Sequence, residues 1–189
     1  MNLIYILIYS SIFVWAIAVF KQYKTDYFYF FLINALTDPI TSWLHLGFHL
    51  MPLSFYPTFI LLKNFSLTKR YKFTFIWSMC MIVLSISLLL GGNIFWLYLL
   101  CLTFTLLIFF VLVNKLIEHI NQTRSFSLFL IMLVFYQLIS LLKYVAILLD
   151  LYKGGISFYL ATFSQILLGI GFLFVNINTK NFPIKVEKF

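Results

Sequence analysis

Residues 31–49, FLINALTDPITSWLHLGFH, decide the fold because they are apolar along their length and yet carry a stripe of polar side chains. An α-helix turns about 100° per residue, which gathers these side chains within an arc of roughly 100°. They are Asn34, Asp38, Thr41, Ser42, His45 and His49. Lipid cannot satisfy such a stripe, so it must face protein or water inside a membrane. Pro39 removes a backbone donor beside Asp38 and predicts a kink there.

The composition is that of a membrane protein. Of the 189 residues, 63% are hydrophobic and only 10% are charged. Soluble domains are about half apolar and about a quarter charged, so the composition excludes a water-soluble globule. The net charge of +8 is expected from basic cytoplasmic loops, and no nucleic-acid partner is predicted. Cys80 and Cys101 lie within apolar runs, without disulfide or metal-binding spacing.

Seven apolar segments have the length and composition of helices that cross a bilayer. They cover residues 3–20, 27–47, 50–66, 73–90, 94–114, 126–149 and 156–176. The third is short and contains Pro52, Pro57 and Lys63. We therefore expect an all-α polytopic membrane protein, with a single bundle of seven transmembrane helices over residues 1–176. A short basic cytoplasmic tail over residues 177–189 would follow it.

The basic residues support this count and set the orientation. If all seven segments span, eleven of the 13 lysines and arginines fall on one side of the membrane. Lys153 alone falls on the other side, and Lys143 lies within the sixth segment. The positive-inside rule then places the N-terminus outside and the C-terminus in the cytoplasm. We expect an inner or plasma membrane, with anionic headgroups against the basic inner face. Lys21 and Lys24 follow the first apolar run, which favours an uncleaved helix over a signal peptide.

A polar cluster is expected in the interior of the bundle. At 1.5 Å per residue, Asp38, Gln137 and Gln165 all lie roughly 16 Å from the inner ends of their helices. An unpaired aspartate there costs on the order of 3 kcal/mol, so it needs partners or a proton. Lys143 would reach either inward to Asp38 or outward to Asp150. The predicted site joins the second, sixth and seventh segments and comprises Asp38, Asn34, Ser42, Gln137, Lys143 and Gln165. Interhelical hydrogen bonding alone is the other interpretation.

A pair of histidines forms a second candidate site. His45 and His49 are four residues apart on one helical face, a spacing that presents two imidazoles to one metal ion. Asp150 is predicted at the same outer level and would be a third ligand. No cofactor is expected, and zinc at this site is the alternative. An ordinary interfacial pair and a pH- or ligand-sensing pair are two further interpretations.

The connections between the segments leave no room for a soluble catalytic domain, and no nucleophile or phosphate-binding motif appears. The leading hypothesis is a non-enzymatic sensing, signal-relay or accessory module with a membrane or cytoplasmic protein partner. The alternative is a small transporter or channel for a proton, a cation or a small solute, with Asp38 as the titrating group. A second alternative is a metal-assisted membrane lipid hydrolase that uses His45 and His49.

Overall fold

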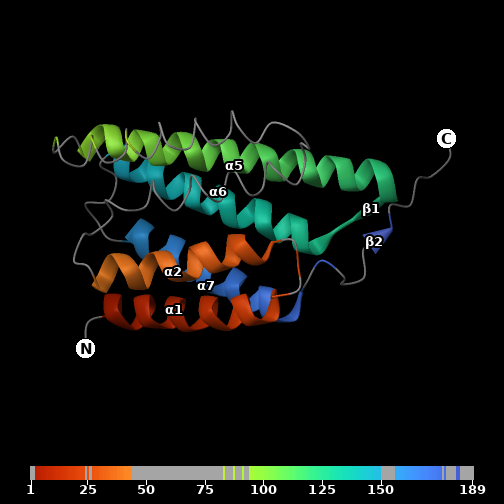
Figure 1. The fold of residues 1–189 in the computed structure, drawn as a ribbon, viewed down its shortest axis with the longest axis horizontal. Coiled ribbons are helices and arrows are strands. Elements are labelled where there is room, and N and C mark those ends of the chain that lie inside the picture. Colours follow the sequence, from red (N-terminus) through yellow and green to blue (C-terminus); the bar gives the residue numbers. More distant parts are fainter. Residues whose placement is uncertain are drawn as a thin grey trace.

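The part of the chain described by this computed structural model contains five helices and one short pair of strands (Figure 1). It comprises residues 3–23, 25, 27–43, 83, 87, 91, 94–149, 156–175, 177 and 182–183. Within these ranges, only the backbone is described at residues 3–5, 8, 37–43, 94, 97, 156–158 and 182–183. The helices are α1 Leu3–Lys21, α2 Phe28–Trp43, α5 Ile94–Thr123, α6 Leu128–Leu148 and α7 Ile156–Phe174.

These helices coincide with five of the predicted apolar segments. The main difference is α5, which continues to Thr123 instead of ending near residue 114. Residues 115–123 contain neither glycine nor proline, so nothing in the backbone ends the helix where the apolar run ends. The predicted segments 50–66 and 73–90 lie outside the described residues, except that Val83 and Ser87 are helical. The seven-helix count therefore stays a prediction.

The described helices pack side by side as a bundle. α1 contacts α2 and α7, while α6 contacts α7 and α5. Figure 1 shows all of them along one long axis, with the C-terminal ends of α1, α5 and α7 beside the N-terminal ends of α2 and α6. We call this the strand end, because both strands lie there. α5 projects beyond the other helices at this end (Figure 1).

Local sequence explains how the chain passes from α5 to α6. Arg124 has a φ of 50°, the left-handed conformation that ends many helices, and its N–H donates to the carbonyl of Ile120. The strand β1, Ser125–Phe126, follows. Ser127 then caps α6, because its hydroxyl accepts a hydrogen bond from the N–H of Leu130. At the end of α5 the carbonyl of Ile120 therefore has a donor, and at the start of α6 the N–H of Leu130 has an acceptor.

Part of the predicted tail lies against the bundle. The strand β2, Phe182–Pro183, pairs with β1 in antiparallel orientation. Val175 and Ile177 are partly buried and pack against the hydrophobic core. The chain that leaves α7 therefore contacts the bundle at every position where the structure describes its side chain or its pairing.

Aromatic side chains form the centre of the core. The ring of Phe31 on α2 is fully buried, and its centroid lies 4.9 Å from that of Phe172 on α7. The corresponding distances are 5.8 Å to Trp15 on α1 and 6.2 Å to Phe129 on α6. Tyr136, also on α6, lies 4.8 Å from Trp15. One cluster of rings therefore joins four of the described helices.

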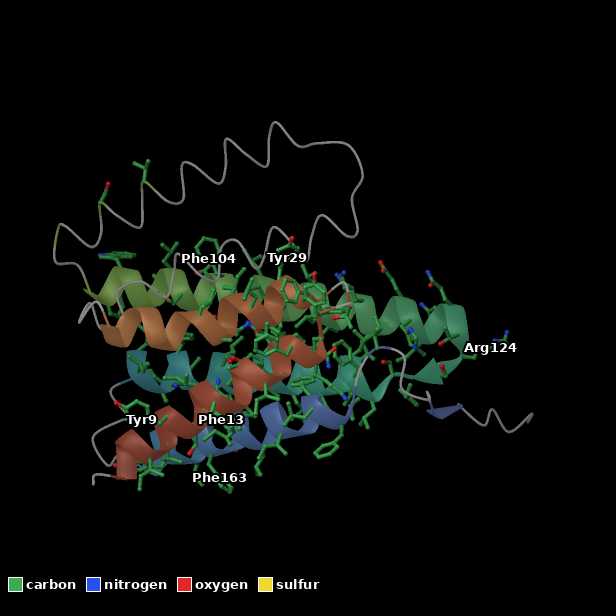
Figure 2. All side chains as sticks on the ribbon, turned by 60° about the horizontal axis from the view of Figure 1, so that its bottom comes forward. Tyr9, Phe13, Tyr29, Phe104, Arg124 and Phe163 are labelled. Atoms are coloured by element: carbon green, nitrogen blue, oxygen red, sulfur yellow. The ribbon has the colours of Figure 1, made fainter. Side chains whose placement is uncertain are left out.

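The outward faces of the bundle are apolar as well. Phe163 on α7 is directed away from the helices and is 52% exposed (Figure 2). Exposed large hydrophobic side chains occur on all five described helices. Two stretches, Tyr98–Thr123 and Leu128–Leu148, are long and apolar enough to cross a membrane. The core helix of a soluble protein passes the same test. However, only 28% of the most apolar window of the first stretch and 39% of that of the second are buried.

Replacing Gly169 with alanine should weaken the contact between α1 and α7. A Cβ at this position would lie 2.7 Å from Cγ1 of Val14. Cβ atoms in folded proteins do not approach other atoms so closely, so the Val14 side chain or the two helices must shift. Overpacking of this kind costs about 1–3 kcal/mol. We expect a lower midpoint of thermal unfolding for the purified protein in detergent, followed by circular dichroism.

Gly171→Ala is the matched control on the same helix. Its Cβ would meet the flexible end of Met132, which can move aside. Alanine also has the better helix propensity, by about 0.8–1.0 kcal/mol. Gly171→Ala should therefore leave the midpoint nearly unchanged, and equal losses in both variants would contradict a specific close approach at Gly169.

Candidate functional site

The first contact of the candidate site joins α2 to α6. Asn34 belongs to the polar stripe, and its Nδ2 donates to the carbonyl of Phe30 one turn earlier, at 2.7 Å. This bond holds the amide so that Oδ1 is available to a neighbouring helix. The hydroxyl of Tyr136 on α6 donates to that oxygen at 3.0 Å. The polar stripe therefore faces α6 at Asn34.

A second contact continues from α6 to α7. The hydroxyl of Ser140 donates to the carbonyl of Tyr136 at 3.0 Å. It also accepts a hydrogen bond from Nε2 of Gln165 on α7, at 3.1 Å. We call Asn34, Tyr136, Ser140 and Gln165 the polar seam. The seam consists of neutral groups and links α2 to α6 and α6 to α7.

Gln137 lies outside the polar seam. Its side chain is 1% exposed, and Nε2 donates to the carbonyl of Thr105 on α5 at 3.2 Å. Thr105 is also buried, and its hydroxyl donates to the carbonyl of Cys101. Among the described side chains, two separate connections therefore involve the predicted residues. Asn34 and Gln165 are joined through α6, whereas Gln137 connects α6 to α5.

Several predicted site residues are only partly described. Asp38 and Ser42 lie in α2, one and two turns beyond Asn34, but their side chains are outside the described part of the structure. His45, His49 and Asp150 lie outside the described residues altogether. Lys143 is partly buried on α6. No group of three or more metal-ligating side chains occurs among the described residues, and the candidate zinc site falls outside them.

Tyr136 and Ser140 are functional candidates that the sequence analysis did not select. They lie one turn apart on α6, and both are buried. A tyrosine or serine in an apolar helix is common, so neither residue type stands out alone. The available signal was their spacing of four residues, which places both on one helical face.

Two further buried polar side chains lie just after α1 and on α7. Nε2 of Gln22 donates to the carbonyls of Phe172 and Val175, at 3.0 and 3.1 Å, at the C-terminal end of α7. Phe172 is one of the last four residues of α7, whose carbonyls lack a partner within the helix, and Val175 directly follows the helix. Oε1 of Gln22 is buried without a hydrogen-bond partner among the described residues. The same is true of the hydroxyl of Thr162, which lies about one turn from Gln165 on α7.

The described part of this chain is thus a helical bundle that is apolar on its outside and is crossed inside by a short polar seam. Comparison with protein-family models, with curated proteins and with solved structures gives no match.

The bond between Asn34 and Tyr136 should be measurable as a coupling energy. Asn34→Leu and Tyr136→Phe each remove one partner, and Tyr136→Phe keeps the ring in contact with Trp15. Interhelical hydrogen bonds in membranes contribute about 0.6 kcal/mol on average and about 1.7 at most. We expect a coupling of that size in a double-mutant cycle on the free energy of unfolding in detergent.

Tyr29→Phe is the matched control for this cycle. Tyr29 lies on the same helix as Asn34 but is 51% exposed. Its effect should add to that of Asn34→Leu without coupling. A coupling of zero between Asn34 and Tyr136, or an equal coupling for Tyr29, would show that the seam contributes nothing specific.

Proposed function

We propose that this chain is an integral, multi-pass membrane protein with seven spans, with its N-terminus outside and its C-terminus in the cytoplasm. The apolar, exposed outer faces of all five described helices support a lipid environment. The end of α2 and the start of α5 lie at the same end of the bundle (Figure 1). An even number of spans between them fits this arrangement. The predicted segments 50–66 and 73–90 supply two.

The charges at the ends of the described helices support the same orientation. Lys21 ends α1, and Arg124 follows α5, both at the strand end. Lys115 lies in the last third of α5, and its Nζ lies 5.5 Å from the ring centroid of Tyr27, the residue before α2. Basic residues at one end of a membrane bundle favour the cytoplasmic side. The strand end is therefore assigned to the cytoplasm.

Within that membrane protein, we propose a non-enzymatic module that senses or relays a signal, or assists a membrane partner. The observation that carries this proposal is the polar seam, in which side-chain hydrogen bonds join α2 to α6 and α6 to α7. Such bonds are worth about 1 kcal/mol in a membrane, so the seam can exchange partners at small cost. A change on one helix then biases the positions of the other two.

Asp38 is the proposed input to the seam. It follows Asn34 by four residues on α2, and that spacing places both on one helical face. A carboxyl group inside a membrane changes its need for hydrogen-bond donors when it binds or releases a proton or a cation. Asn34, one turn away, is the nearest seam residue along the helix. A change at Asp38 would therefore reach Tyr136 through Asn34.

A small transporter or channel for a proton, a cation or a small solute is the second candidate. The buried hydroxyl of Thr162, without a partner among the described residues, favours it. Buried polar groups normally have a partner, and a hydroxyl without one is available to a passing solute or to water. Asp38 would then be the titrating or coordinating group of the pathway.

Proton flux separates the two candidates. The purified protein is reconstituted into liposomes that contain a pH-sensitive dye, and a pH gradient is applied. A sensing or relay module should give the same rate as protein-free liposomes, in the wild type and in Asp38→Asn. Flux above that background that is lost in Asp38→Asn would contradict the module and support transport.

Recovery of a protein partner tests the relay directly. The tagged chain is isolated from native membranes in mild detergent, and the copurifying proteins are quantified. If the seam controls the partner-binding conformation, Asn34→Leu should lower recovery of a specific partner several-fold, since it removes the α2–α6 bond. Tyr29→Phe should leave recovery unchanged, and equal recovery from both variants would contradict a relay through the seam.

A further inference from the structure

The chain that leaves α7 is held at two places at the strand end. We call residues 175–183 the tail strap, of which Val175, Ile177, Phe182 and Pro183 are described. Nε2 of Gln22 donates to the carbonyl of Val175, at the beginning of the strap. β2 pairs with β1 at its other end, with Phe182 opposite Phe126 and Pro183 opposite Ser125. The strap therefore connects the ends of α1 and α7 to the α5–α6 connection.

The attachment to β1 is short. Two residues of the strap face two residues of β1. Pro183 has no N–H, so it cannot donate to the strand pair. Phe126 remains 42% exposed, so its ring is not enclosed by the docked strap. An isolated two-stranded ribbon is marginally stable at best, and a competing interaction of modest strength is sufficient to release this one.

The charge of the tail favours such a competitor. Residues 177–189 carry Lys180, Lys185 and Lys188, with Glu187 as the only acidic side chain. The docking site adjoins Arg124, which is exposed and also positive (Figure 2). Like charges oppose docking at low ionic strength. An anionic lipid surface attracts each lysine near it, whereas β1 offers the tail no negative charge.

We propose that the tail strap exchanges between β1 and the anionic headgroups at the cytoplasmic surface of the membrane. This inference rests on the proposed membrane location and orientation. In a neutral membrane the strap pairs with β1 and links the end of α7 to the α5–α6 connection. In an anionic membrane the lysines bind headgroups, β2 leaves β1, and the edge of β1 becomes free. The strap is therefore a lipid-sensitive contact at the strand end of the bundle.

A disulfide between the two strands tests the exchange. Phe126→Cys and Phe182→Cys place thiols at directly opposed positions, which lie within cross-linking reach in an antiparallel pair. The background carries Cys80→Ala and Cys101→Ala, which removes both natural cysteines. The full chain is reconstituted into phosphatidylcholine vesicles, with or without phosphatidylserine, and oxidised with copper phenanthroline. We expect cross-linking about tenfold slower in the phosphatidylserine vesicles.

Two controls make the result decisive. The pair Asn121→Cys and Phe182→Cys, with Asn121 exposed on α5 and outside the strand register, should cross-link slowly in both vesicles. Replacing Lys180, Lys185 and Lys188 with glutamine should remove the lipid dependence and keep the fast cross-linking of the opposed pair.

The possible failures are distinguishable. Cross-linking of the opposed pair no faster than that of the control pair in neutral vesicles would show that the strap does not dock on β1. Equal rates for the opposed pair in both lipid compositions would overturn the exchange. Failure of the chain to float with vesicles after carbonate washing would contradict the proposed membrane location itself.

Discussion

The contact between the rings of Phe31 and Phe172 lies at the centre of the ring cluster that joins α1, α2, α6 and α7. Phe31 is fully buried and brings α2 against α7, while Trp15 and Phe129 add α1 and α6 to the same cluster. Lipid tails are as apolar as these rings, so a bundle in a membrane gains little from burying them. Packing contacts and edge-to-face geometry must supply the specificity instead.

The α1–α7 interface adds two close contacts of its own. The backbone at Gly169 lies so close to Val14 that a methyl group does not fit between them. At the strand end, the same approach brings Gln22 to the last carbonyls of α7. A glutamine there replaces the water that would satisfy these carbonyls at an exposed helix end. Gly169 therefore allows the two helices to approach closely along the interface, and the amide of Gln22 forms hydrogen bonds at its end.

The sequence predicts helix positions better than helix neighbours. The bounds of α1, α6 and α7 lie within two residues of the predicted segments, because long apolar runs limited by polar residues specify them. The last part of α5, residues 115–123, is mostly polar and lies beyond the apolar run, so hydropathy does not predict it. In the candidate site, Asn34 and Gln165 can be predicted because they are polar residues within apolar segments. Their partners cannot, since sequence alone does not fix the rotation that turns Tyr136 toward α2 and Gln137 toward α5.

Tyr136 belongs to both the core and the seam, and this double role links packing to the proposed relay. Its ring packs 4.8 Å from Trp15 and 6.0 Å from Phe30, and its hydroxyl binds Asn34. The hydroxyl cannot follow a displaced Asn34 without moving the ring. The ring cannot move without disturbing Trp15, because packed interiors respond in discrete rearrangements rather than by gradual deformation. In the relay proposed above, a small polar change on α2 would therefore reach α1, and Gln22 at the end of α1 donates to the carbonyls of Phe172 and Val175. The polar seam and the tail strap would then respond to the same displacement.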